Sequence, residues 1–254
     1  DYLNDKQKEA VLANDGPVLI LAGAGSGKTS VLTTKVAYLI KEKCVNPRNI
    51  LAITFTNKAA KEMKERVIKL VGSIGYDIQI STFHSFGLRI IKENYEKLGY
   101  EKNFTIIDSD DSLTVVKKIL KEMGIDYARF NPKFIKNQIS SCKNEMVTPE
   151  KYKNLVNDEL SDITYKVYKK YQDTLLRNNS VDFDDLLIKP IELFNKYKEV
   201  LENYQELFKY VFIDEYQDTN EAQYILSKMI SAKYKNICVV GDDAQSIYSW
   251  RGAN

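Results

Sequence analysis

The sequence predicts an α/β fold in which helices flank a parallel β-sheet, with an all-helical subdomain inserted into it. At both ends of the chain, short apolar runs typical of buried parallel strands alternate with helical patterns. A glycine-rich turn joins the first of these strands to a helix. Between residues 108 and 190, long helical patterns rich in Lys, Asp and Asn follow one another without a convincing strand.

Five strands are expected in the α/β segments, because each run is short, apolar and bounded by turn residues. They cover residues 18–21, 50–55, 78–82, 210–213 and 237–240. The helices of these segments are expected at residues 5–14, 28–42, 57–70, 84–97 and 221–230. Asn57 has a side chain suited to a helix N-cap and is expected to begin the third of these helices.

The inserted helices are clearest at residues 110–123, 132–142 and 162–177. The sequence therefore predicts an α/β domain made of residues 1–107 and 191–254, and a helical insertion of residues 108–190. Alternation of strands and helices implies a parallel sheet with right-handed crossovers.

The composition is that of a soluble globular protein, with 254 residues of which 44% are hydrophobic and 28% charged. No apolar run is long enough to span a bilayer, and the first residues contain no signal-peptide core. Three scattered cysteines and a single histidine support neither a disulfide framework nor a Cys/His zinc site. Buried thiols and a cytoplasmic location are expected.

Charge is unevenly distributed along a chain whose net charge is only +2. Residues 31–71 contain nine Lys or Arg and three Glu, whereas residues 181–222 contain four Lys and eleven Asp or Glu. A basic block near a phosphate-binding turn suits a nucleotide or a nucleic acid. Charge alone is equally compatible with solvated helix faces.

A glycine-rich turn between a strand and a helix predicts a phosphate-binding loop. Glycines allow several backbone N–H groups to converge on one phosphate, and the helix N-terminus adds positive partial charge. Lys28 is expected to reach the terminal phosphates, and the Thr29 hydroxyl to ligate Mg²⁺. The alternative is a turn that binds nothing. The segment consists of Ala22, Gly23, Ala24, Gly25, Ser26, Gly27, Lys28 and Thr29, with alanine in place of the first glycine of the common pattern.

Two carboxylates follow the apolar strand at 210–213, where they are expected to face the same crevice as the loop. Asp214 is expected to hold Mg²⁺, and Glu215 to orient and deprotonate the attacking water. Gln245 follows the next strand and is placed to sense the γ-phosphate or its water. The alternatives are an acidic loop for the pair and a turn residue without a role for Gln245.

Two later segments, Asp214-Glu-Tyr-Gln-Asp-Thr-Asn220 and Gly241-Asp-Asp-Ala-Gln-Ser-Ile-Tyr-Ser-Trp-Arg-Gly252, complete a pattern that runs through the whole chain. With them, the sequence resembles the N-terminal motor half of a superfamily 1 DNA helicase of the UvrD/PcrA/Rep type. Seven segments match in order, at residues 3–7, 22–29, 54–60, 81–86, 181–186, 210–220 and 239–252. Alanine at position 22 is usual in this family. Ser30 stands where family members usually carry arginine, which bears on one phosphate contact and not on the site as a whole.

The resemblance implies a P-loop NTPase fold of the RecA-like kind and an ATP- and Mg²⁺-dependent helicase that moves 3′ to 5′ on single-stranded DNA. It implies that Gln7 hydrogen-bonds the adenine base. Single-stranded and duplex-junction DNA are the implied partners, and no obligate oligomer is expected. The family's second motor domain, which carries an arginine finger, is absent from these 254 residues. We therefore expect a fragment that binds ATP weakly and hydrolyses it poorly.

The DNA side is expected to combine aromatic stacking with backbone contacts in a groove. A strand end followed by a helix N-terminus suits a phosphate, and the only tryptophan lies in a polar loop beside a tyrosine and an arginine. For Phe55 a place in the core is an equal alternative, and for Phe183 a helix-capping position is. The expected nucleic-acid contacts are Phe55, Thr56, Asn57, Lys58, His84, Phe86, Phe183, Tyr248, Trp250 and Arg251.

Two other functions remain open. One is the motor of a helicase–nuclease of the same superfamily. The other is a nucleotide-binding module that contacts nucleic acid without turnover, which the intact set of Lys28, Thr29, Asp214, Glu215 and Gln245 argues against. A kinase or a GTPase fits poorly, because it has no use for the aromatic segment at 248–250.

Overall fold

The computed structural model describes residues 5–12, 16–21 and 28–241. The chain divides into two compact units. We call the first the sheet unit; it contains residues 1–86, 197–219 and 226–254. We call the second the helical unit; it contains residues 87–196 and 220–225. Each unit is described by itself.

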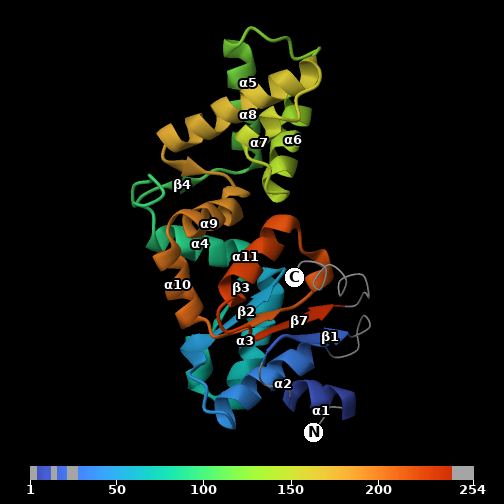
Figure 1. Ribbon diagram of the computed structural model, residues 1–254, viewed down its shortest axis with the longest axis vertical. Helices are drawn as coiled ribbons and strands as arrows, with labels where there is room; N and C mark the ends of the chain where they lie inside the picture. The colour runs from blue at the N-terminus through green and yellow to red at the C-terminus, as the bar shows by residue number, and fades with distance from the viewer. Residues whose placement is uncertain (1–4, 13–15, 22–27, 242–254) are drawn as a thin grey trace. The chain divides into compact units, whose positions relative to one another are not determined.

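The described part of the sheet unit contains a five-stranded parallel sheet in the order β1-β7-β6-β2-β3 (Figure 1). The five expected strands are confirmed, with ends that differ by at most one residue. They are β1 (Val18–Leu21), β2 (Ile50–Thr54), β3 (Gln79–Thr82), β6 (Tyr210–Ile213) and β7 (Ile237–Gly241). All residues of β2 and β7 are buried, as expected when helices cover both faces of a parallel sheet.

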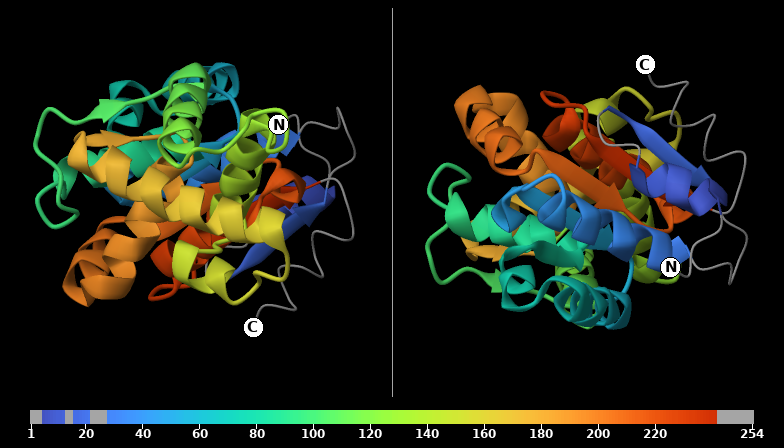
Figure 2. Two further views of the ribbon diagram at one scale, coloured as in Figure 1. Left: turned by 90° about the horizontal axis from the view of Figure 1, so that it is seen from above. Right: turned by 90° about the horizontal axis from the view of Figure 1, so that it is seen from below.

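The helices follow from the strand order. The connections from β1 to β2 and from β2 to β3 run in one direction along the sheet, whereas the connection from β6 to β7 runs in the other. Right-handed crossovers therefore place α2 (Lys28–Lys41) and α3 (Asn57–Val71) on one face, and α11 (Glu221–Ser231) on the other (Figure 1). In the right-hand view of Figure 2, α1 (Asp5–Leu12) lies beside α2, which in turn contacts α3. A core lies on the sheet face that α2 and α3 cover. It contains Leu32, Leu39, Met63 and Val67 of these helices and Ile50, Phe212 and Val240 of the strands.

The N-cap of the third helix lies one residue earlier than expected. Thr56, not Asn57, is the N-cap of α3: its backbone is extended, and its Oγ1 accepts a 3.0 Å hydrogen bond from Ala59 N. The prediction for Asn57 was wrong because the hydroxyl of the preceding residue already binds the third N–H of the helix. Asn57 itself is the first helical residue.

The helical unit is built from α5 (Ser109–Glu122), α6 (Pro132–Asn144), α7 (Pro149–Lys153), α8 (Glu159–Arg177) and α9 (Asp185–Lys196). Reciprocal capping boxes begin α5 and α8, where Asp108 and Asp158 accept from the third N–H of each helix. The sequence did not predict α7, which has only five residues, or α9, which contains Pro190. It also missed α10 (Lys198–Leu207) of the sheet unit. Apolar faces of α5, α6 and α8 form the core, with Val116, Leu120, Ile135, Ile139, Val167 and Tyr171 among its members.

Two details of the helical unit correct the expectations. The unit is not all-helical, because β4 (Thr105–Ile106) pairs in parallel with β5 (Ser180–Val181). The unit also begins before residue 108. Helix α4 (Phe83–Glu93) ends four residues earlier than expected, and Ile91 and Tyr100 pack with Val181 and Leu186 in a second small core. This packing gives residues 87–107 to the helical unit.

Among the described residues, no helix is both long and apolar enough to cross a membrane. The three thiols are free; Cys142 and Cys238 are buried as expected, whereas Cys44 is exposed.

Candidate nucleotide and nucleic-acid site

The strand register brings most of the predicted site to one edge of the sheet. Leu21 pairs with Gly241, Ile213 pairs with both Val239 and Ile53, and Thr54 pairs with Thr82. Residues 55, 83 and 214 directly follow β2, β3 and β6, and they therefore leave the sheet within one residue of the same level. Neighbouring strands are about 4.8 Å apart. The predicted nucleotide segments follow β1, β7 and β6, and the predicted DNA segments follow β2 and β3, so β6 and β2 are where the two sets meet.

On the nucleotide side, the described residues begin at the N-terminus of α2. Lys28 is the first residue of this 14-residue helix, and Thr29, which is half-buried, lies in its first turn. The N-terminus of a helix of this length favours an anion. Residues 22–27 and Gln245 lie outside the described residues, as do the side chains of Gln7 and Lys28.

The carboxylate pair is held by the sheet. Asp214 N donates a 3.0 Å hydrogen bond to Ile53 O, which extends the pairing of β6 and β2 past the end of the strand. The Asp214 side chain is buried, and its Oδ1 accepts a 2.8 Å hydrogen bond from Glu215 N. Glu215 has a left-handed backbone conformation, with φ of 53° and ψ of 42°. This conformation is unfavourable for a residue other than glycine by about 1–2 kcal/mol.

Glu215 differs from the other described non-glycine residues with positive φ. These are Cys44, Met146, Asn179 and Lys235, and each lies within four residues after the end of a helix, where a left-handed residue is common. Glu215 instead lies two residues after the end of a strand. In a continuing strand, adjacent side chains point to opposite faces. The left-handed turn breaks this alternation immediately after Asp214.

The oxygen donors at this edge fit a magnesium ion. Thr29 and Asp214 offer a hydroxyl and a carboxylate, which are the hard ligands that Mg²⁺ prefers. No cluster of three or more metal-binding side chains occurs within residues 5–12, 16–21 and 28–241.

On the DNA side, two aromatic rings meet at the ends of β2 and β3. Phe55 and Phe83 contact edge to face, with ring centroids 5.6 Å apart. Phe55 is half-buried and Phe83 is buried, so Phe55 exposes part of its ring while Phe83 supports it. Sequence reasoning missed Phe83, although its place directly after a predicted strand, like that of Phe55, was a usable signal.

The N-terminus of α3 carries exposed polar residues. Thr56, Asn57 and Lys58 are all exposed, and α3 is 15 residues long. His84 lies in the first turn of α4 and is half-buried. Burial lowers the pKa of His84 to about 4. The imidazole is therefore neutral at pH 7 and offers hydrogen bonds instead of a positive charge.

Phe86 is not available to DNA in this structure. Its side chain is fully buried, and its ring packs edge to face against Phe208 at 5.6 Å. The sequence placed it two residues from His84, but α4 begins at Phe83 and turns Phe86 toward the core. Tyr248, Trp250 and Arg251 lie outside the described residues. Phe183, in the helical unit, is 57% exposed.

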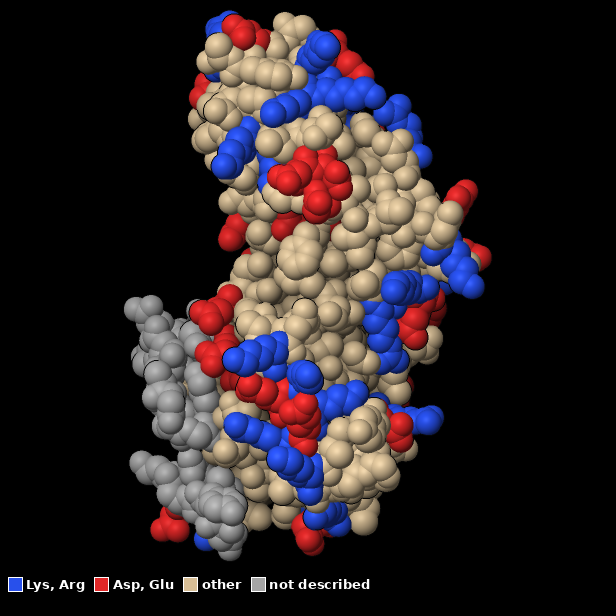
Figure 3. Space-filling model, turned by 180° about the vertical axis from the view of Figure 1, so that it is seen from behind, with Lys and Arg blue, Asp and Glu red and all other residues tan. Residues whose placement is uncertain are grey.

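The basic block at residues 31–71 gives only weak support to a nucleic-acid surface. Lys35 is buried, and burial lowers its pKa. On α3, exposed Lys61 and Arg66 alternate with exposed Glu62 and Glu65. On the face drawn in Figure 3, basic and acidic side chains are likewise interspersed. The Phe55–Phe83 pair and the N-terminus of α3 therefore give stronger support to a nucleic-acid surface than the basic residues do.

The family of the chain follows from comparison with known proteins. A family model described as the UvrD/REP helicase N-terminal domain matches residues 3–254. The chain belongs to this family. Its parallel sheet and flanking helices agree with the RecA-like motor domain that the resemblance implied.

Similar proteins in this family are bacterial helicases. The ATP-dependent DNA helicase PcrA of Bacillus subtilis (strain 168) is 52% identical over 252 residues, which are 99% of this chain and 34% of that protein. The protein of the same name from Staphylococcus aureus (strain NCTC 8325) is 52% identical over 254 residues, which are 100% of this chain and 35% of that protein. The chain thus spans about a third of the length of the curated relatives it matches.

Proposed function

We propose that the chain is the ATP-binding motor part of a DNA helicase that moves 3′ to 5′ along single-stranded DNA. The observation that carries the proposal is the pairing of β6 with β2, which puts the carboxylate pair beside the predicted DNA segment. Similar proteins are named ATP-dependent DNA helicases. For the whole protein we propose single-stranded and duplex-junction DNA as partners, and a cytoplasmic location.

The nucleotide side is proposed to bind ATP as follows. Backbone N–H groups of residues 22–27 and the N-terminus of α2 bind the phosphates, Lys28 contacts the terminal ones, and Gln7 contacts the adenine. Thr29 and Asp214 would hold Mg²⁺, which when bound neutralises charge on the phosphates.

Hydrolysis is proposed to depend on Glu215. Its carboxylate orients the attacking water and accepts a proton from it, while Gln245 senses the γ-phosphate. Asp214 is anchored through Ile53 O and itself binds Glu215 N. This chain of bonds sets where the Glu215 side chain begins. We infer that the strained backbone is retained at Glu215 because it redirects the carboxylate out of the strand alternation.

The DNA side is proposed to hold single-stranded DNA by stacking. Phe55, supported by Phe83, offers one platform, and Phe183, Tyr248 and Trp250 offer others. Thr56, Asn57, Lys58, His84 and Arg251 are proposed to contact phosphates or base edges. Each stacked base is worth about 1–3 kcal/mol, so two or three platforms would supply most of the affinity.

Coupling between the two sides is proposed to run through the β6–β2 edge. The hydrogen bond from Asp214 N ends at Ile53 O, only two residues before Phe55. A shift of the carboxylate segment on ATP hydrolysis would therefore reach the stacked base through few atoms. The segment at 239–252 provides a second proposed connection, since it contains both Gln245 and Trp250.

The test uses the whole protein in an ATPase assay with and without single-stranded DNA. Turnover should be stimulated by DNA, and Phe55→Ala should raise the DNA concentration needed for half-stimulation by about 5- to 100-fold, as loss of one stacked base predicts. Tyr76→Ala is the matched control, because Tyr76 is an exposed aromatic of the same unit outside this edge. Absence of DNA stimulation would refute the proposed coupling. Unwinding of duplexes with a 5′ tail but not a 3′ tail would refute the polarity.

A further inference from the structure

An exposed aromatic side chain lies between two buried carboxylates in the helical unit. The turn of residues 182–185 joins β5 to α9. Phe183 is 57% exposed, whereas Asp182 and Asp185 are 5% and 1% exposed. Carboxylates are almost never buried to this degree without a partner of opposite charge.

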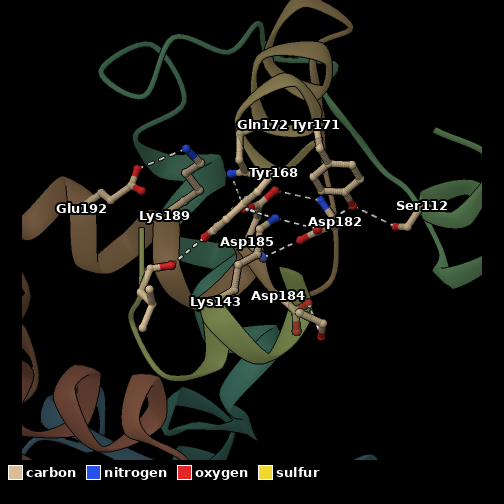
Figure 4. A network of polar contacts seen from close by, with 12 residues as sticks. Ser112, Lys143, Tyr168, Tyr171, Gln172, Asp182, Asp184, Asp185, Lys189 and Glu192 are labelled. Atoms are coloured by element: carbon tan, nitrogen blue, oxygen red, sulfur yellow. Dashed lines mark hydrogen bonds and ion pairs between the residues drawn. The ribbon is translucent and has the colours of Figure 1, made fainter. Parts of the chain in front are cut away.

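The partner is a lysine from α6. The Lys143 side chain is fully buried, and its Nζ lies 2.6 Å from Asp182 Oδ2 and 3.1 Å from Asp185 Oδ1 (Figure 4). It also lies 5.0 Å from the centroid of the Tyr171 ring. Burial acts to lower the pKa of Lys143, but the two carboxylates outweigh it and the pKa is raised. Lys143 is therefore a buried cation at physiological pH.

The remaining carboxylate oxygens hold the backbone of the turn. Asp182 Oδ1 accepts a 2.8 Å hydrogen bond from Asp185 N, and Asp185 Oδ2 accepts a 3.0 Å hydrogen bond from Asp182 N. Each carboxylate thus uses one oxygen for Lys143 and the other for the backbone across the turn. Phe183 and Asp184 are the two residues inside this bracket, so one ammonium group fixes both ends of the segment that presents the phenyl ring.

Further contacts hold the same turn from α8, from α6 itself and from α4. Tyr171 of α8 places its Oη 2.7 Å from Asp182 Oδ2 and 3.1 Å from Ser112 Oγ of α5. On α6, Ser140 Oγ donates a 2.7 Å hydrogen bond to Asp184 Oδ2. Gly87 of α4 lies so close to Leu186, the residue after the turn, that a Cβ added there would be 1.8 Å from the Leu186 carbonyl oxygen.

We propose that Lys143 is a positioning residue for DNA binding, which fixes the 182–185 turn so that the Phe183 ring is held ready for a nucleobase. The inference rests on the proposed function, in which Phe183 stacks on a base of single-stranded DNA. A buried ion pair adds little stability over well-packed apolar residues. What it supplies here is geometry. A side chain already held in its binding orientation loses less conformational entropy when it binds.

A double-mutant cycle on the whole protein tests the proposal, with affinity for a labelled oligothymidine as the measurement. Phe183→Ala should weaken binding by about 5- to 100-fold, as loss of one stacked base predicts. Lys143→Met keeps the length of the side chain and removes its charge. It should weaken binding by about fivefold in the natural background, but by less than about twofold when Phe183 is already alanine. Lys133→Met, which removes an exposed charge from the same helix, should weaken binding equally in both backgrounds.

Equal losses from Lys143→Met in both backgrounds would overturn the proposal, because a purely structural lysine acts independently of Phe183. Unchanged affinity of Phe183→Ala would overturn it too, and would remove Phe183 from the DNA site while leaving the Phe55 test intact. If Lys143→Met does not fold by circular dichroism, Tyr171→Phe replaces it. That variant removes only the hydroxyl bound to Asp182, and should cost about twofold in the natural background and nothing measurable with Phe183→Ala.

Discussion

The chain contains two acidic segments that look alike in sequence and are built for different purposes. In each, a strand is followed directly by a carboxylate: β5 (Ser180–Val181) by Asp182, and β6 (Tyr210–Ile213) by Asp214. In the first, Asp182 and Asp185 are neutralised by a buried lysine of the same unit, and the exposed group is an aromatic ring. In the second, the sheet itself aligns Asp214, and the next residue carries backbone strain.

The difference shows how to separate a structural carboxylate from a chemical one. In the first segment, each carboxylate oxygen of Asp182 and Asp185 is used to hold a turn. In the second, the backbone adopts an unfavourable conformation at Glu215. Strain of this kind persists where the surrounding structure imposes it, and functional sites are where it tends to cluster. The number of acidic residues after a strand therefore says less than the partner of each one.

The largest expected effect is a loss of ATP turnover when Glu215, the proposed general base, is changed. Glu215→Gln removes the proposed base and keeps the size of the side chain. ATP turnover of the whole protein at saturating ATP and DNA should fall by about 10²–10⁴-fold, the usual contribution of a general base. Glu65→Gln, an exposed acid-to-amide change on α3, is the control. Phosphate release is the measurement, and turnover within threefold of the natural protein would contradict the role of Glu215.

Glu215→Gly separates the catalytic role of the Glu215 carboxylate from the steric cost of its left-handed backbone. Glycine adopts positive φ without the steric cost of a Cβ, although it has more freedom to lose on folding. This variant should lose turnover as fully as Glu215→Gln, yet unfold in urea at the same or slightly higher denaturant concentration. A clear loss of stability would mean that the Glu215 side chain supports the fold.

The second effect concerns how the first segment is supported. Helix α9 contains Pro190, which has no N–H to donate to the Leu186 carbonyl four residues earlier. The Gly87 backbone lies against that carbonyl. Gly87→Ala places a methyl group there and should destabilise the protein by about 1–3 kcal/mol, as overpacking of a tight contact does.

Urea unfolding measures this loss, with Lys92→Ala on the exposed face of the same helix as the control. Because Asp214 and Glu215 belong to the other unit and are held by β2, the affinity of the remaining folded protein for ATP should not change. Stability within 0.5 kcal/mol of the natural protein, a change typical of exposed positions, would contradict the close approach of Gly87 and Leu186.

The smallest expected effect is a pH dependence of stability caused by His84, which lies after β3 beside the proposed DNA contacts. Unlike Lys143, this side chain is uncharged at pH 7. The pKa of His84 is lowered by burial to about 4, below the ordinary value of 6.5. A histidine whose pKa is lowered on folding contributes stability at pH values above 6.5. This stability is lost as the pH falls from 6.5 to about 4. His84→Gln should therefore lose less stability than the natural protein when urea unfolding is compared at pH 7 and pH 5. An equal loss in both proteins would show that the imidazole is not desolvated.

Local patterns predicted a large part of this molecule. Each strand of the sheet was found within one residue, because a buried parallel strand is a short apolar run whatever surrounds it. The family resemblance was confirmed by the family model that matches residues 3–254. Finding the strands also located their carboxyl ends, so the sequence indicated that Asp214 and Phe55 would lie at one edge of the sheet.

The helical unit was harder to predict, for reasons that particular residues make clear. Lys143 is 39 residues from Asp182 in sequence. The one local signal was that it continues the apolar face of Ile135, Ile139 and Cys142 on α6. The paired strands β4 and β5 have only two residues each, too few for a periodic pattern. Phe86 is an aromatic residue close to His84 in sequence and so was predicted to contact DNA. Its packing against Phe208 shows that it belongs to the core.

The sequence by itself determined the α/β class, the strands, the family and the chemistry available at the strand ends, because these depend on residue type and local spacing. The tertiary structure decided which carboxylates are paired with a lysine and which phenylalanines are exposed. It also decided that Gly87 must be a glycine, because its backbone lies against the Leu186 carbonyl. Those outcomes depend on groups far apart in the chain, and burial makes each contact count: a charge or a methyl group that water would tolerate must find a partner or a space inside the protein.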